Sequence, residues 1–211
     1  MNPPADEPDS PMRPEPLRER EPARLDGLSP AYFGMVMATG VVSLAADLMG
    51  MPFVAMALFL LNCAIYVVLW VLTLLRIARY PRRVFDDLID HLRGPGFFTV
   101  VAGTCVLGSQ FVLLTAEYRV AMALWAAAVV LWVGLTYTIF TGFTIKERKP
   151  PLQQGISGAW LLAVVAPQSI AVLAALLAAH VGQPGRLELN FFALSMWLWG
   201  GMLYIWMMSL I

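Results

Sequence analysis

The sequence predicts an all-α membrane protein built from helical hairpins. Hydrophobic residues make up 59% of the 211 positions and charged residues only 13%, and the mean hydropathy is +0.71. A water-soluble chain of this length cannot bury so much apolar surface, so the bilayer must serve as its solvent. The apolar runs do not alternate between polar and apolar residues, which argues against membrane-spanning strands and leaves helices.

Six apolar runs are each long enough to cross about 30 Å of hydrocarbon, which takes roughly 20 helical residues. Their expected limits are 30–48, 53–76, 95–115, 120–144, 156–180 and 189–211. Together they define a transmembrane domain over residues 28–211. Residues 1–27 are polar and rich in Pro, Arg and Glu, so we expect a disordered cytoplasmic tail there. Acidic residues near its start argue against a signal peptide.

The first, third and fifth spans resemble one another. Each opens on a Gly or Pro break and an aromatic residue (Phe33, Phe97 and Trp160), and this pattern repeats after about 64 residues. Small residues fill their middles and suit close helix approach, whereas most Trp residues lie in the even spans, where lipid contact suits them. The pattern predicts three hairpins, with odd helices inside and even helices outside. The alternative is that the small residues only pack helix against helix, without a pore.

Positive charges predict the orientation in the membrane. The link after the second span carries five arginines, and the link after the fourth carries Lys146, Arg148 and Lys149. The links on the other side hold only Arg119 and Arg186. Since basic residues favour the cytoplasmic side, we expect a multi-pass protein of the plasma (inner) membrane with a cytoplasmic N-terminus.

The predicted spans carry no Asp, Glu, Lys, Arg or His in their interiors. Because buried ionisable groups usually mark proton relays and ion-coupled carriers, this composition favours passive passage. Neutral hydroxyls and amides hold an anion weakly, as conduction requires, although each hydroxyl can instead bond back to its own helix. We expect the path to be lined by Phe33, Thr39, Gly40, Ser43, Gly103, Thr104, Pro167, Gln168 and Ser169, with Arg93 at the cytoplasmic mouth.

An acidic motif offers a different function. Asp86, Asp87 and Asp90 form a D-D-x-x-D pattern after the second span, and such carboxylates can hold Mg²⁺ against a diphosphate, as in membrane prenyltransferases. Those enzymes need a second acidic cluster, which the sequence lacks, so we expect these acids to pair instead with Arg79, Arg82, Arg83 or Arg93. We therefore expect no catalysis, no cofactor and no bound metal. Cys63 and Cys105 fall inside spans and are expected to be small core residues.

Three segments resemble one known family. The run from Pro30 to Gly40, with Ser43, resembles the first helix of the tellurite-resistance/dicarboxylate transporter family, which includes the bacterial TehA-type channels and the plant slow-type (voltage-dependent) anion channels. The run 90–98, leading into Gly103-Thr104-Cys105, is similar to the third helix of that family, and 158–169 resembles the fifth. The resemblance covers residues 28–211.

This resemblance implies ten helices in five hairpin repeats, with the odd helices lining a central pore and commonly a trimer. It also implies passage of inorganic anions or C4-dicarboxylates, with the lipid bilayer, small anions and further copies of the chain as partners, and no nucleic acid. We expect the 211 residues to cover six of the ten helices. A non-conducting truncated fragment is therefore an open alternative, beside the Mg²⁺-dependent enzyme.

Overall fold

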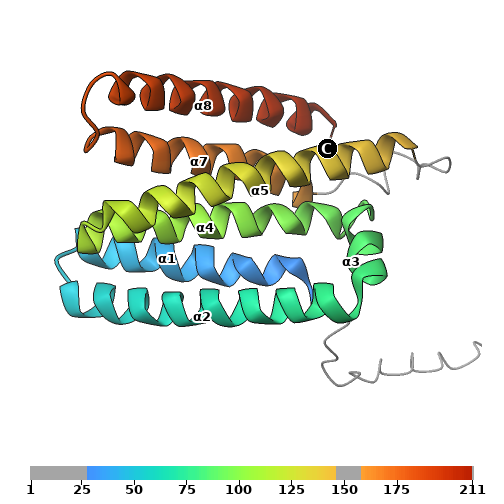
Figure 1. The fold of residues 1–211 in the computed structure, drawn as a ribbon, viewed down its shortest axis with the longest axis horizontal. Helices are drawn as coiled ribbons and strands as arrows, with labels where there is room; N and C mark the ends of the chain where they lie inside the picture. The colour runs from blue at the N-terminus through green and yellow to red at the C-terminus, as the bar shows by residue number, and fades with distance from the viewer. Residues whose placement is uncertain (1–27, 146–157, 211) are drawn as a thin grey trace, which may run out of the picture.

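The computed structural model describes residues 28–145 and 158–210, which form helices joined by short connections (Figure 1). The predicted tail, residues 1–27, lies outside the described residues. The long helices are α1 (Phe33–Leu48), α2 (Pro52–Arg79), α4 (Phe98–Gln110), α5 (Tyr118–Ile145), α7 (Leu162–Ala178) and α8 (Gly185–Leu210).

With the short segments that adjoin them, these helices provide six candidate membrane spans within the described residues. The spans are Pro30–Leu48, Pro52–Arg79, Gly94–Thr115, Tyr118–Gly142, Gly158–Ala178 and Gly185–Leu210. Each begins and ends within four residues of the range expected from the sequence. The chain is thus an all-α membrane protein.

The three odd-numbered spans begin in the same way. Each begins with a short 3₁₀ turn before its α-helix: η2 (Pro30–Tyr32), η3 (Gly94–Phe97) and η5 (Gly158–Leu161). Proline suits such first turns because its fixed φ is compatible with a helix and its missing N–H has no helical partner there. Phe33, Phe97 and Trp160 are all buried, with at most 8% of each residue exposed. The repeat in the sequence therefore corresponds to a repeated anchor in the fold.

Proline also separates α2 from the short helix α3 (Pro81–Leu88). The ring of Pro81 disfavours helical geometry at the preceding residue, and Tyr80 accordingly leaves the helical region, with φ −135° and ψ 53°. α3 lies across one end of the bundle, at a large angle to the long helices (Figure 1). Gly50, with φ +74°, makes the tight turn between α1 and α2 at the opposite end.

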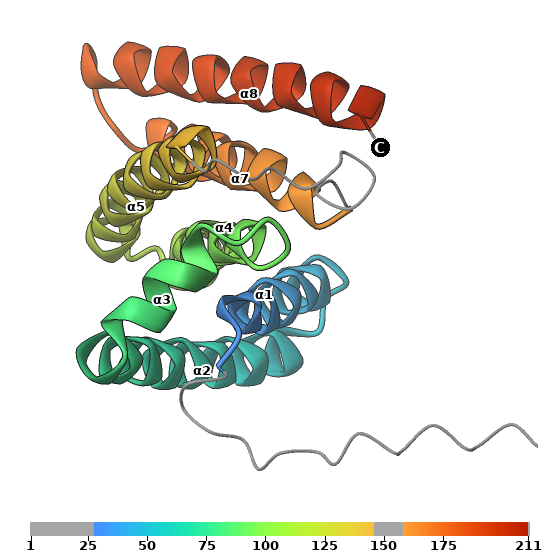
Figure 2. The ribbon, with the colours of Figure 1, turned by 90° about the vertical axis from the view of Figure 1, so that its right-hand side faces the viewer.

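The helices form two layers. α4 packs against α1, α5 and α7, while α2 packs mainly on α1 and α8 on α7. Seen end-on, α1, α4 and α7 follow an inner arc with α2, α5 and α8 around its outside (Figure 2). Burial follows this order for α4 and α7. In the most apolar stretch of 18 residues, 78% of the α4 span and 56% of the α7 span are buried, against 11–22% in the outer spans. The α1 span is intermediate at 28%, because no described helix covers its far side.

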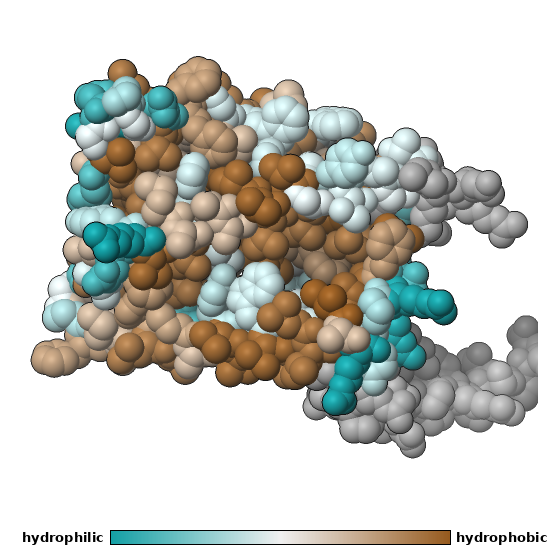
Figure 3. All heavy atoms as spheres, in the orientation of Figure 1, coloured by the Kyte–Doolittle hydropathy of each residue, from teal (hydrophilic) through white to brown (hydrophobic). Residues whose placement is uncertain are grey.

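Apolar side chains also cover much of the outer surface. Large hydrophobic residues are more than half exposed along the outer helices, among them Phe53, Leu60, Tyr137, Phe191 and Ile205. In Figure 3 the apolar surface lies between hydrophilic patches at the two ends of the bundle. Such a belt is stable in lipid rather than in water.

Candidate functional site

A cleft of about 250 Å³ lies between α4 and α7. It is lined by Cys105, Val106 and Ser109 of α4 and by Val164, Val165, Gln168, Ser169 and Val172 of α7. α5 packs against both α4 and α7 but contributes no residue to the cleft. The cleft therefore opens on the other side of the α4–α7 pair, which is the uncovered side of the inner arc.

Neutral polar groups lie along this cleft. The Ser109 hydroxyl donates to the carbonyl of Cys105 at 3.0 Å, and the Ser169 hydroxyl donates to that of Val165 at 2.9 Å. The Gln168 amide reaches the outer layer, where Nε2 donates to the carbonyl oxygen of Trp197 at 3.0 Å. None of the eight lining residues is Asp, Glu, Lys, Arg or His. The cleft thus offers dipoles without a fixed charge.

α1 packs closely against α4 beside the cleft. A Cβ added at Gly40 would lie 2.4 Å from Cγ1 of Val106, a cleft residue. A Cβ at Gly103 would lie 3.1 Å from the carbonyl oxygen of Phe33. The Phe33 ring packs edge-on against two aromatic rings of α2. These three predicted path residues therefore lie in helix–helix contacts.

The other predicted residues of α1, α4 and α7 divide between packing and the cleft. Ser43 is buried and donates to the carbonyl of Ala55 on α2 at 2.7 Å. Thr104 donates to the carbonyl of Val100 and lies 3.0 Å from the Tyr66 hydroxyl. Thr39 is half-buried on α1, and Pro167 is buried inside α7. Of the nine residues predicted for the path, Gln168 and Ser169 are those that line the cleft.

A buried pair of amides stands beside Gly40. The side-chain nitrogen of Asn62 donates to Oε1 of Gln110 at 2.6 Å, and both residues are fully buried. A Cβ at Gly40 would lie 3.0 Å from the Asn62 nitrogen and 3.2 Å from the Gln110 oxygen. The absence of a side chain at Gly40 therefore leaves space for the amide pair. Sequence analysis did not identify this contact, because the two residues are 48 positions apart.

At the end of the bundle near α3, Asp87 binds two arginines. Its carboxylate accepts from Arg76 at 2.5 Å and from Arg93 at 3.0 Å. The side chains of Arg76 and Asp87 are 4% and 13% exposed, whereas that of Arg93 is 55% exposed. Arg93, predicted to face anions at the mouth, thus has a carboxylate partner. Arg76 was not among the partners expected from the sequence for these acids.

This geometry disfavours the magnesium site. Asp87 is engaged by the two arginines, and Asp90 Oδ1 accepts from the backbone N–H groups of Leu92 and Arg93, both at 2.9 Å. Within the described residues, no group of three His, Cys, Asp or Glu side chains is arranged to hold a metal ion.

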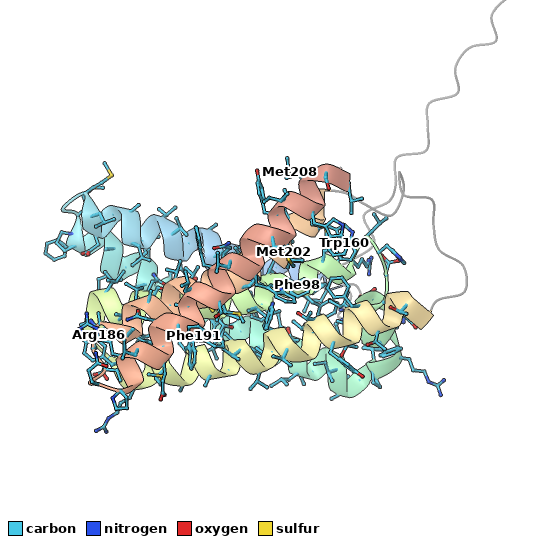
Figure 4. All side chains as sticks on the ribbon, turned by 90° about the horizontal axis from the view of Figure 1, so that it is seen from above. Phe98, Trp160, Arg186, Phe191, Met202 and Met208 are labelled. Atoms are coloured by element: carbon cyan, nitrogen blue, oxygen red, sulfur yellow. The ribbon has the colours of Figure 1, made fainter. Side chains whose placement is uncertain are left out.

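Two larger, mainly apolar clefts lie between the outer helices and the inner ones. One of about 420 Å³ lies where α5 and α8 diverge, with Phe98 on its floor (Figure 4). The other, of about 700 Å³, lies between α7 and α8 and shares Gln168 with the α4–α7 cleft. Their walls are rich in Trp, Met and Leu and suit lipid contact. The smaller cleft lies between two inner helices and is lined by the polar side chains Ser109, Gln168 and Ser169, so it is the better candidate for a path through the protein.

Comparison with known proteins identifies the family. The sequence profile of the voltage-dependent anion channels matches residues 27–211. No curated protein and no solved structure gives a significant match. The chain therefore belongs to the voltage-dependent anion channel family.

Proposed function

We propose that this member of the voltage-dependent anion channel family forms part of the wall of a passive anion path. The path would run along the uncovered side of α1, α4 and α7. The observation that carries the proposal is the α4–α7 cleft, which combines neutral polar groups with the absence of Asp, Glu, Lys, Arg and His from its lining. An anion crossing there would meet no fixed positive charge to trap it and no carboxylate to repel it.

The serines of the cleft supply adjustable donors. Both hydroxyls donate to their own helix backbone, so turning one toward an anion breaks a hydrogen bond worth about 1 kcal/mol. That cost keeps the holding of an anion weak, and a weakly held anion can leave. Small inorganic anions are the proposed substrates, and C4-dicarboxylates are the larger ones that this class of path would admit.

The expected orientation in the membrane follows from the basic residues of the links. The distribution of positive charge, with arginines beside α3 and basic residues after α5, supports a cytoplasmic location for both of those links. The N-terminus would then be cytoplasmic, and the membrane would be the plasma (inner) membrane. A trimer is the proposed assembly, from the resemblance of the sequence to its family.

Chloride efflux from vesicles that contain the purified protein tests the path. We expect the double substitution Ser109→Val and Ser169→Val to lower the efflux rate at least fivefold, because it removes both hydroxyls and adds methyl groups to the cleft. Ser195→Val is the matched control, since this serine also bonds to its own helix, at the Phe191 carbonyl, but lies on outer helix α8. Equal efflux from wild type, control and double variant would overturn the assignment of the cleft as the path.

A further inference from the structure

We infer that α3 and the end of α2 form a binding surface for anionic phospholipid headgroups. The surface consists of Arg79, Tyr80, Arg82, Arg83 and Phe85, all of which are exposed. Nothing in the proposed path requires these residues. The inference is independent of which side of the membrane carries α3.

The surface lies at the depth of the headgroups. α2 has 28 residues, about 42 Å at 1.5 Å per residue, whereas the hydrocarbon layer is about 30 Å thick. α2 is therefore longer than the hydrocarbon is thick, and its last turn, which carries Arg76 and Arg79, is the end that would extend beyond it. α3 follows at once and runs across the bundle axis (Figure 1), an orientation that would lay it along the membrane surface.

Internal contacts hold α3 in this position. Asp87 on the inner side of α3 binds the buried Arg76 of α2. The neighbouring Ile89 packs on α5, since a Cβ at Gly142 would lie 2.5 Å from its Cγ2. With its inner side held by these contacts, the helix presents Arg82, Arg83 and Phe85 outward.

Charge decides the partner. Arg79 and Arg82 make no ion pair within the described part of the chain. The guanidinium carbon of Arg83 lies 5.9 Å from the centre of the Tyr80 ring. The exposed carboxylate of α3 is Asp86, and Arg79 and Arg82 already outnumber it. Cations beside exposed aromatic side chains at a membrane surface are complementary to phosphate groups that carry acyl chains.

Lipid titration of the purified full-length protein, followed by native mass spectrometry, tests the surface. The probes are phosphatidylglycerol and phosphatidylcholine with identical acyl chains. One variant carries Arg79→Gln and Arg82→Gln. The control carries Arg119→Gln and Arg186→Gln. It removes the same charge from two exposed arginines at the N-terminal ends of α5 and α8, which lie at the end of the bundle opposite α3 (Figure 1).

We expect the wild type and the control to prefer phosphatidylglycerol and the α2–α3 variant to lose that preference. The expected loss is about 25-fold, or about fivefold for each arginine near an anionic headgroup. Absence of a preference in the wild type would overturn the inference. An equal loss in the two variants would also overturn it, because net charge rather than this surface would then be responsible.

Discussion

Arg76 is a buried cation at the end of a membrane-spanning helix, and its environment explains why it is tolerated. The cost of removing a guanidinium from water is offset only by a well-placed carboxylate and further hydrogen bonds. Asp87 supplies that carboxylate and also binds the more exposed Arg93. The adjacent Asp86 points outward and is exposed. Two neighbouring aspartates thus have opposite environments, which the sequence motif alone does not distinguish.

The two aspartates make a matched pair of variants. Asp87→Asn removes the carboxylate that faces Arg76, so we expect it to lower the free energy of unfolding by about 3 kcal/mol. Asp86→Asn changes an exposed side chain and should shift it by less than about 0.5 kcal/mol. Unfolding in mixed detergent micelles measures both. Equal effects would show that the buried ion pair does not stabilise the fold.

At the scale of elements, the α1–α4 contact depends on residues without side chains. Gly40 and Gly103 let the two helices approach, and the Asn62–Gln110 amide pair fills the remaining space beside Gly40. The small residues were identifiable from the sequence, but their role was not. A glycine that lines a path and one that admits a neighbouring helix have the same local pattern, and only the partner helix distinguishes them.

Substitution of the α1 glycines separates close packing from path lining. We expect Gly40→Leu to lower the unfolding temperature clearly, because overpacking a tight contact costs about 1–3 kcal/mol and even a Cβ would lie 2.4 Å from Val106. Gly34→Leu is the control, since a Cβ there meets nothing within 4 Å. A thermal scan in detergent measures both. An unchanged unfolding temperature for Gly40→Leu, with a change in anion flux alone, would favour a path role instead.

Other elements differ in how far the sequence could predict them. The six spans follow from long apolar runs, because the bilayer thickness sets a minimum length. α3 and the π-helical turn η4 (Phe111–Thr115) were not predicted, because α3 is a single amphipathic stretch of only eight residues and η4 is continuous with the apolar run of the third span. Gln168 and Ser169 could be nominated for the candidate site as polar residues in an apolar helix. Val106, Val165 and Val172 could not, because a cleft valine resembles any other apolar residue in sequence.

At the scale of the whole molecule, three similar hairpins pack side by side with α4 at the centre. Among the described helices, this arrangement leaves α1, α4 and α7 with one uncovered side, where the candidate cleft lies. Because the chain belongs to the voltage-dependent anion channel family, we expect anions to pass along this side. The neutral lining of the cleft makes passive movement of anions down their gradient the expected mode.

The reversal potential of the purified protein in a planar bilayer under a potassium chloride gradient tests this account most directly. We predict a current that reverses close to the chloride equilibrium potential and that flows without a proton gradient. A reversal close to the potassium equilibrium potential, or no current above that of the protein-free bilayer, would contradict the central claim.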